Sequence, residues 1–332
     1  MLHITNGDAA VERMRDGGLR GEYLPWRDVL HDGPVPYTGT LKELSEIRVR
    51  HLAASGNGEE ALIAAEFAHR DAQLSRYEWF EEIVFWFEHD LYDQLQLLQV
   101  LDWMGHQPKL APVSLIVIGT YPGIDRFVGL GQLSPEQLVG LLEMRIPATP
   151  EHFAAAIEGW HAFRQPDPTG LARMLEQDVP ALPFLRGAVL RLLEELPSVT
   201  NGLSRTERTA LGIVSQGIAH PAEIFAELQS LEQRPWLGDW SFWKILADLT
   251  QGAEPLLETA DRRRFRHPPM QLDGPDFNEQ ALQLTRAGRE VLENRRDALR
   301  LRPIDRWLGG THLQRGAIWR WNEEKLQLVA DS

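Results

Sequence analysis

The sequence predicts an α/β protein in three parts: an N-terminal Rossmann-like parallel sheet, a helical connector and a C-terminal winged-helix-like α+β domain. Strand and helix patterns alternate in the first part, and Ile83–Phe87 is apolar at every position, as expected of a strand covered on both faces. Later, three helical segments precede a two-stranded ribbon and another helix, the order of a winged helix-turn-helix. We expect these parts to span residues 1–125, 126–200 and 201–332.

The N-terminal part is predicted from its hydrophobic periodicity. Short apolar runs indicate buried strands, and apolar residues at every third or fourth position indicate helices. The expected elements are strand Leu2–Thr5, helix Ala9–Asp16, strand Glu22–Pro25, two helical stretches, strand Ile83–Phe87, helix Leu91–Met104 and strand Ser114–Ile118. This alternation favours a parallel sheet with helices on both faces.

The next segments are predicted from helix start and stop signals. Residues 134–196 are helical in pattern and are interrupted by prolines, with Thr149-Pro150 a favourable N-cap and first-turn pair. Beyond the Asn201-Gly202 turn, Ser204 and Glu207 have the spacing of a capping box. The expected elements are helices Ser204–Gln216, Pro221–Leu231 and Gly238–Thr250, strand Pro255–Leu257, a long polar insertion, strand Ala281–Leu284, a helix from Thr285, and a hairpin of Ile318–Trp321 with Leu326–Val329.

Composition limits the class of protein. The 332 residues include no cysteine, which excludes disulfides, thiolate zinc sites and cysteine nucleophiles. The formal net charge of −14 disfavours nucleic acid and anionic lipid as partners, although eleven arginines gather between residues 262 and 306. No apolar run approaches the roughly 20 residues of a membrane helix, and the N-terminus lacks a signal-peptide pattern. We therefore expect a cytoplasmic protein without membrane association.

Polar clusters follow three of the predicted strands. The carboxyl ends of parallel strands form the edge at which such sheets bind ligands, so we expect the clusters to converge there. The candidate catalytic residues are His31, Asp32, Glu88 and His89, and the candidate substrate-binding residues are Asn6, Asp8, Arg27, Asp28, Asp90, Asp93 and Gln94.

Structural roles also explain several of these residues. Asp90 is the natural N-cap of the helix that begins at Leu91, and Asp93 lies in its first turn, where a carboxylate meets free backbone amides. Asp8 can cap the first helix in the same way. His31 lies in a loop whose backbone is restrained by Gly33 and Pro34, and a histidine with only a structural role is the alternative there.

Two chemistries suit the whole set. Carboxylates with neutral imidazoles can hold a divalent metal that activates water or binds phosphate. Alternatively, a His–Asp pair can act as general base while Arg27 binds an anionic substrate. The spacing matches no established metal signature, and the chain contains no Walker motif or dinucleotide fingerprint. The sequence therefore leaves the cofactor open, with a divalent metal as one option.

The winged-helix-like part has a poor surface for reading DNA. Its third helix, Gly238–Asp248, carries one lysine, two aspartates and three large aromatic residues, which we expect to pack against a neighbouring domain or chain. The segment Arg262–His267 is either a basic wing or a solvated loop.

Four stretches resemble a known family: Leu2–Asp8, Leu24–Pro36, Trp86–Leu95 and, near the C-terminus, Arg306–Leu313. They are similar to the bacterial family called domain of unknown function 1835, most specifically over residues 1–125. His31-Asp32 stands where the family has His-Glu, which leaves the carboxylate in place. The resemblance implies no established reaction, cofactor or catalytic residue.

The expected function is therefore binding of a small polar or phosphorylated ligand at the carboxyl edge of the sheet, with hydrolysis or group transfer as the reaction if the protein is an enzyme. A ligand-responsive winged-helix transcription regulator is one alternative. The other is a protein–protein interaction module, including a homo-oligomer, in which exposed Trp236, Trp240 and Trp243 form the contact surface.

Overall fold

The computed structural model describes residues 1–109, 112–267 and 275–331. The chain is mixed α/β and divides into two compact units, Met1–Leu190 and Arg191–Ser332. Residues 126–190, most of the expected connector, belong to the first unit.

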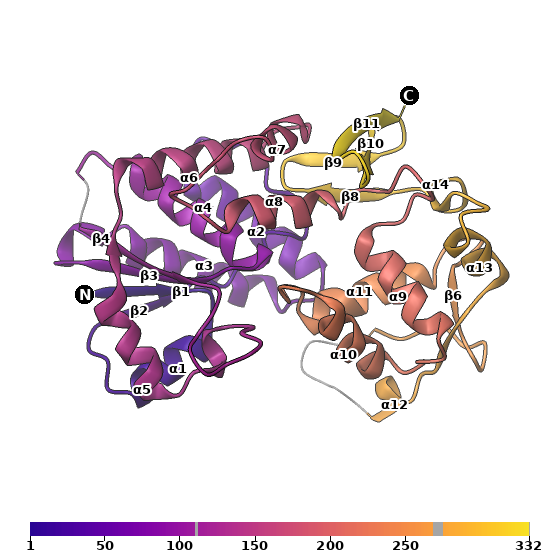
Figure 1. Ribbon diagram of the computed structural model, residues 1–332, viewed down its shortest axis with the longest axis horizontal. Helices are drawn as coiled ribbons and strands as arrows, with labels where there is room; N and C mark the ends of the chain where they lie inside the picture. Colours follow the sequence, from indigo (N-terminus) through magenta and orange to yellow (C-terminus); the bar gives the residue numbers. More distant parts are fainter. Residues whose placement is uncertain (110–111, 268–274, 332) are drawn as a thin grey trace. The chain divides into compact units, whose positions relative to one another are not determined.

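The first unit contains a five-stranded, mostly parallel sheet (Figure 1). Its strands are β1 (Leu2–Thr5), β2 (Glu22–Pro25), β3 (Ile83–Glu88), β4 (Val113–Ile118) and β5 (Ile146–Pro147). They lie in the order β2-β1-β3-β4-β5, so β2 and β5 are the two edges. The first four strands are parallel, as predicted, whereas β5 pairs antiparallel with β4 and was not predicted.

Helices cover both faces of this sheet. The helices from the start of the chain to the end of this unit are α1 (Asp8–Asp16), α2 (Leu41–Ala54), α3 (Glu60–Leu74), α4 (Leu91–Gly105), α5 (Pro135–Gly140), α6 (Pro150–Phe163), α7 (Thr169–Met174) and α8 (Leu185–Leu193), with short 3-10 turns at Tyr77–Trp79, Leu130–Gln132 and Leu141–Met144. In Figure 1, α1 and α5 lie on one side of the sheet, and α4 and α6 lie on the other.

The central strand β3 explains why the apolar run Ile83–Phe87 has no polar alternation. Val84 and Trp86 pack with Met14 of α1 and Leu138 of α5 on one face of the sheet. Because successive side chains point to opposite faces, the intervening residues of β3 face the α4 side. Every residue of the strand, including Glu88, is buried. The sheet therefore delivers a carboxylate directly into the interior at the carboxyl end of β3.

The second unit combines helices with short antiparallel strand pairs. Its elements are α9 (Arg205–Ser215), α10 (Pro221–Leu231), α11 (Asp239–Leu249), β6 (Leu257–Thr259), α12 (Pro275–Asn278), β7 (Leu282–Leu284), α13 (Arg286–Leu292), α14 (Ala298–Leu301), β8 (Asp305–Leu308), β9 (Thr311–Gln314), β10 (Ile318–Asn322) and β11 (Gln327–Asp331). The pairs β6–β7 and β10–β11 confirm the predicted ribbon and tail hairpin, and β8–β9 is an additional hairpin. Residues 268–274 of the predicted polar insertion lie outside the described residues.

The prediction of exposed tryptophans is wrong for two of the three residues, Trp236 and Trp243. Trp236 and Trp243 are 8% and 5% exposed, respectively. Trp243 packs against Phe225, Phe242 and Phe277, with ring centroids between 4.9 and 5.7 Å apart. The aromatic side of α11 that contains Trp243 therefore packs into the core of its own unit, whereas Trp240 is half-buried.

Among the described residues, no helix combines the length and the apolar character needed to cross a membrane.

Candidate functional site

The candidate site lies where the order of the parallel strands reverses. The chain passes from β1 to β2 on one side of β1 and returns with β3 on the other side. In open α/β sheets, the carboxyl ends of the strands on either side of such a reversal border the crevice that binds ligands. Here the loop after β1 carries Asn6, and the loop after β3 carries His89 and Asp90.

Three buried carboxyl groups gather at this position. They belong to Glu88 at the end of β3, Asp90 at the N-cap of α4 and Asp93 in the first turn of that helix. One oxygen from each lies within 4.8 Å of the others. The predicted capping role of Asp90 is confirmed, because its Oδ1 accepts a hydrogen bond of 3.1 Å from the backbone amide of Asp93.

Backbone and amide donors hold this cluster in place. Asp93 Oδ1 accepts a 2.6 Å hydrogen bond from the amide of Glu88, and its Oδ2 accepts a 2.9 Å bond from the side chain of Asn6. Glu88 Oε1 accepts a 2.6 Å bond from the amide of Leu130. Gln94 donates to the carbonyl oxygen of Glu88 at 2.6 Å, which fixes the end of the strand. The structure thus brings together Asn6, Glu88, Asp90, Asp93 and Gln94.

Burial makes ionisation of the cluster unfavourable. It raises the pKa of Glu88 well above its usual range, and the charges of Asp93 and Asp90 raise that pKa further. Burial followed by the charge of Asp93 does the same to the pKa of Asp90. The pKa of Asp93 is raised by burial to about 7. At neutral pH the three groups therefore need protons or a cation to lower their mutual repulsion.

A glycine from another part of the chain closes the site over Glu88. A Cβ atom at Gly129 would lie 2.6 Å from Glu88 Oε2, so only glycine allows this loop to approach the carboxylate. Neither Gly129 nor Leu130 was predicted as a site residue, because no local motif marks a loop that reaches its partner across more than forty residues of sequence.

His89 lies beside the cluster in an aromatic environment. Its ring centroid is 6.1 Å from that of Phe127 and 5.9 Å from that of Phe184, and the side chain is buried. Gly119 also packs closely here, since a Cβ atom at this position would lie 3.1 Å from His89 Cβ. The imidazole is thus held in an enclosed space beside the carboxyl groups.

Asp8 and Arg27 form a separate, exposed pair. The Arg27 guanidinium donates to both carboxylate oxygens of Asp8 at 2.7 and 2.5 Å, and the two side chains are 47% and 54% exposed. The hydrogen bond from Arg27 lowers the pKa of Asp8, and the same bond raises the pKa of Arg27. They border a pocket of about 210 Å³ between the end of β2 and α3. Arg27 is therefore neutralised by Asp8 rather than poised over the carboxyl cluster.

Asp28 and Asp32 stabilise the loop that follows β2. Asp28 forms a completely buried ion pair of 2.9 Å with Arg48 of α2, whose guanidinium also donates to the carbonyl oxygens of Val29 and Asp32. Asp32 lies 3.5 Å from His51 of α2. No sequence signal marked Arg48, because one arginine in an amphipathic helix resembles a solvated side chain. In this loop, the centroid of the His31 ring lies 6.0 Å from the centroid of the Tyr92 ring in α4.

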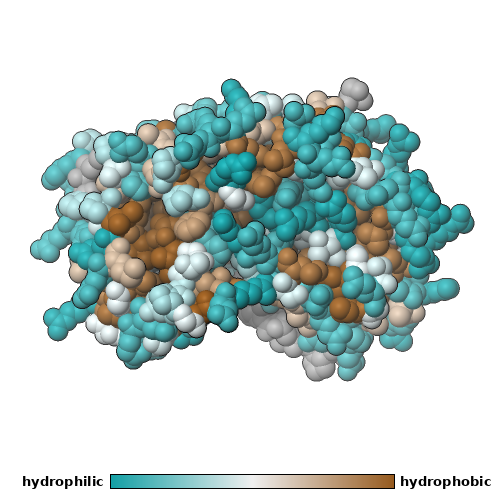
Figure 2. Space-filling view, in the orientation of Figure 1, coloured by the Kyte–Doolittle hydropathy of each residue, from teal (hydrophilic) through white to brown (hydrophobic). Residues whose placement is uncertain are grey.

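A small apolar groove borders the cluster at Gln94. It has a volume of about 150 Å³ and is lined by Leu115–Ile118 of β4 together with Met144, Ile146 and Leu182. Figure 2 shows the surrounding surface as a hollowed hydrophobic patch between α5 and α6. The groove provides apolar surface next to the polar groups, a combination typical of small-molecule sites.

Comparisons of the chain with protein-family models and with curated proteins found no match. The resemblance to domain of unknown function 1835 stays a prediction.

Proposed function

We propose that the first unit binds a small phosphorylated ligand through a divalent cation held by Glu88, Asp90 and Asp93. The observation that carries this proposal is the spacing of their oxygen atoms, which lie within 4.8 Å of one another. Oxygen ligands of one Mg²⁺ or Ca²⁺ lie about 2.0 to 2.6 Å from the ion, so two of them are at most about 5 Å apart. The spacing therefore fits a single ion.

The charge of the cluster supports the same proposal. Three carboxylates this close cannot all be ionised in a buried site without compensation. A divalent cation supplies that compensation and, in the case of Mg²⁺, commonly keeps positions for water or phosphate oxygens. The adjoining apolar groove would receive the rest of the ligand.

The strand order supports a Rossmann-like assignment for this unit. The site lies at the reversal between β1 and β3, the position at which such sheets bind their ligands. A cation that neutralises phosphate charge favours hydrolysis or group transfer as the reaction. His89 and His31 are the candidate groups for proton transfer in that reaction.

The test is cation-dependent stability of the whole chain, measured with Asp90→Asn. Asparagine is as favourable as aspartate at a helix N-cap, so this variant removes a charge and keeps the cap. We expect Mg²⁺, Mn²⁺ or Ca²⁺ to raise the unfolding temperature of the wild type, since a ligand at 100 times its Kd adds about 2.7 kcal/mol. The control is Glu143→Gln, which changes an exposed carboxylate. An equal rise in both variants, or none in the wild type, would refute the cation site.

The ligand is then tested by calorimetry with inorganic phosphate, nucleoside monophosphates and sugar phosphates, with and without the cation that stabilises the protein. We expect binding that requires the cation and is weakened at least tenfold by Asp90→Asn. Binding of equal strength in chelator would leave the cation without a role in ligand recognition.

The arrangement of the second unit favours one further candidate function, a winged-helix regulator. The order α9, α10, α11, β6, β7 and α13, with the short α12 between β6 and β7, supports this assignment. Four arginines on the β6–β7 connection, Arg262, Arg263, Arg264 and Arg266, are exposed and border a pocket of about 570 Å³ beside the end of α11. An exposed basic wing is a surface that can contact DNA phosphates.

Fluorescence anisotropy with duplex DNA at about 50 mM salt, where phosphate contacts are weakly screened, tests this candidate. The double variant Arg263→Gln/Arg264→Gln should bind at least fivefold more weakly than Arg286→Gln/Arg295→Gln, a control with the same change of charge on the same unit. Binding that is absent in the wild type, or equal in the two variants, would exclude the wing as a DNA contact.

A further inference from the structure

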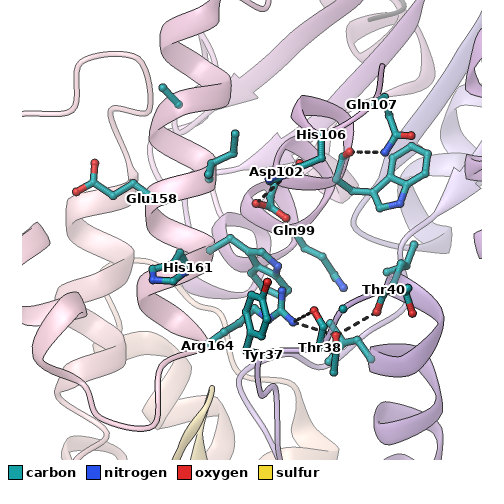
Figure 3. Close-up of a pocket in the computed structure, with 17 residues that line it drawn as sticks. Tyr37, Thr38, Thr40, Gln99, Asp102, His106, Gln107, Glu158, His161 and Arg164 are labelled. Atoms are coloured by element: carbon teal, nitrogen blue, oxygen red, sulfur yellow. Dashed lines mark hydrogen bonds and ion pairs between the residues drawn. The ribbon is translucent and has the colours of Figure 1, made fainter. Parts of the chain in front are cut away.

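A second and larger pocket lies between α4, α6 and the start of α2 in the first unit (Figure 3). Its volume is about 1000 Å³, at the upper end of the range for small-molecule sites. One face of α4 contributes Gln99 and Asp102, its C-cap contributes His106, and one face of α6 contributes Ile157 and His161. Residues three and four apart on a helix share a face, so each helix presents a continuous wall.

This pocket is separate from the carboxyl cluster. Asp90 caps the N-terminus of α4, whereas Asp102 lies in its last turns. Twelve residues separate the two, and at 1.5 Å per residue they are about 18 Å apart along the helix axis. The two sites therefore occupy opposite ends of the same helix.

Gln99 is the residue that indicates a ligand. Its side chain is 2% exposed, and its Oε1 accepts a 2.8 Å hydrogen bond from the indole of Trp26. Its Nε2 is buried and has no hydrogen-bond partner among the described residues. In Figure 3 the amide end of this side chain turns toward Thr40 at the start of α2. A buried donor without an acceptor costs about 1 to 3 kcal/mol, which a ligand oxygen or ring nitrogen would recover.

Asp102 supplies the complementary acceptor. It follows Gln99 by three residues on the same face of α4, its side chain is 18% exposed, and it lies 3.6 Å from His106. Burial raises the pKa of Asp102, and the charges of His106, Arg164 and His161 oppose that rise. The lining of the pocket thus includes a hydrogen-bond donor, Gln99 Nε2, and an acceptor, the Asp102 carboxyl group, on neighbouring turns of α4.

The cationic group at the pocket is already engaged. Arg164 is 9% exposed, and its guanidinium donates to the carbonyl oxygens of Pro36 and Thr38 and to the Thr38 hydroxyl. It also lies 5.0 Å from the ring of Tyr37 and 5.5 Å from that of Trp160. The guanidinium therefore stabilises the loop that contains Pro36 and Thr38, and its donors are used there instead of by a ligand.

The helix ends at the pocket do not favour an anion either. At the start of α2, the amides of Gly39 and Thr40 donate to the Glu43 carboxylate, which uses these donors and adds a negative charge. The C-terminal end of α4 presents the negative pole of its dipole. Asp102 and Glu158 add two carboxyl groups to the lining. An uncharged ligand suits this environment better than a phosphate or a carboxylate.

We propose that this pocket binds an uncharged planar heteroaromatic compound that presents an acceptor to Gln99 and a donor to Asp102. Tyr37, Trp103 and Trp160 supply aromatic surface in the lining, and aromatic side chains can stack on the faces of such rings. Nucleobases are planar rings that carry both acceptors and donors on their edges, so nucleosides are the probes of choice.

The test is titration of the full chain with guanosine, adenosine, cytidine and uridine in buffer containing a chelator, followed by ligand-detected NMR or calorimetry. Asp102→Ala and Gln99→Glu are each expected to weaken binding at least tenfold. The second change keeps an acceptor for Trp26 and removes the free donor. The matched controls are Glu143→Ala and Gln327→Glu, which alter exposed side chains by the same chemistry.

We also expect nucleosides to bind at least threefold more tightly than the corresponding 5′-monophosphates. Circular dichroism shows whether each variant is folded, and the more exposed Asp102 keeps the test informative if Gln99→Glu unfolds. The proposal is overturned if no nucleoside binds saturably, if Asp102→Ala binds as well as Glu143→Ala, or if the monophosphates bind more tightly. Because a chelator is present, none of these outcomes depends on the cation site.

Discussion

The side-chain amide of Asn6 donates a 2.9 Å hydrogen bond to Asp93 Oδ2 and thereby joins the loop after β1 to the first turn of α4. The two residues are 87 positions apart in the sequence. This contact orders one oxygen of the buried carboxyl cluster. It also opposes the effect of burial, because a hydrogen bond to the ionised form lowers the pKa of Asp93.

Replacement of Asn6 by alanine should therefore weaken both the fold and the site. We expect a loss of about 1 to 3 kcal/mol in the free energy of unfolding, the usual cost when a buried group loses its partner. The pKa of Asp93 should rise further. Urea unfolding measures the first effect, and NMR titration of the carboxyl carbon measures the second. An unchanged pKa would show that Asn6 does not control Asp93.

Stability should fall as the pH rises in metal-free buffer. The folded protein holds its protons more tightly than the unfolded chain, because the pKa values of Glu88, Asp90 and Asp93 are raised in the fold. The protonated carboxyl groups contribute fully to the stability of the fold below pH 3.8, the ordinary pKa of aspartate. This contribution is lost as the pH rises through about 7, the pKa of Asp93 in the folded protein. For Asp93 alone this difference corresponds to roughly 4 kcal/mol as an upper bound.

Urea midpoints between about pH 5 and pH 8, a range that spans the raised pKa of Asp93, measure this dependence. The wild type should lose stability across the range, and Asp90→Asn should lose less, because it removes one of the interacting charges. Glu143→Gln should follow the wild type. A wild-type midpoint that does not change with pH would contradict the assignment of protonated carboxyl groups to the metal-free site.

The two arginines near β2 should differ strongly in their contribution to stability. Arg48→Met leaves the Asp28 carboxylate buried without its partner, and we expect a loss of about 3 to 5 kcal/mol. Arg27→Met breaks an exposed pair and should cost less than about 1 kcal/mol. Chemical denaturation of both variants checks the contrast. Similar losses would mean that Arg27 has a role beyond its pairing with Asp8.

A methyl group at Gly129 should disturb the carboxyl cluster. In Gly129→Ala the new Cβ would lie 2.6 Å from Glu88 Oε2, so the loop or the carboxylate must move. We expect a loss of about 1 to 3 kcal/mol and a much smaller thermal shift with divalent cations. Gly140→Ala is the control, since its backbone is helical and a Cβ atom there would have open space within 4 Å. If divalent cations raise the unfolding temperature of the two variants equally, Gly129 has no role in the cation site.

Strongly periodic segments allowed most of the fold to be predicted. The parallel strands, the helix after β3 and the ribbon of the second unit each have a local pattern of apolar residues. By contrast, β5 is a two-residue strand whose pairing depends on the neighbouring β4, so no local pattern indicates it. The burial of Trp243 was also missed, because a helix with large aromatic residues has the same sequence whether they face its own core or a partner.

The candidate site was predictable only where its residues are neighbours in the sequence. Glu88, Asp90 and Asp93 lie within six residues, so a single strand end identifies them. Their partners Asn6 and Leu130 come from distant loops. Only Asn6 could be predicted, because it directly follows the predicted strand Leu2–Thr5. The pocket containing Gln99 was not predicted, since its walls are helix faces that the sequence pattern alone does not pair.

The two edge strands of the sheet both contain a proline, Pro25 in β2 and Pro147 in β5. Proline has no amide hydrogen to donate, so each border lacks a donor that an incoming strand would need. Extension of this sheet into a second molecule is thus disfavoured from either direction. An association between copies of the protein through the first unit would therefore use side-chain surfaces on its helices and loops instead of the edges of this sheet.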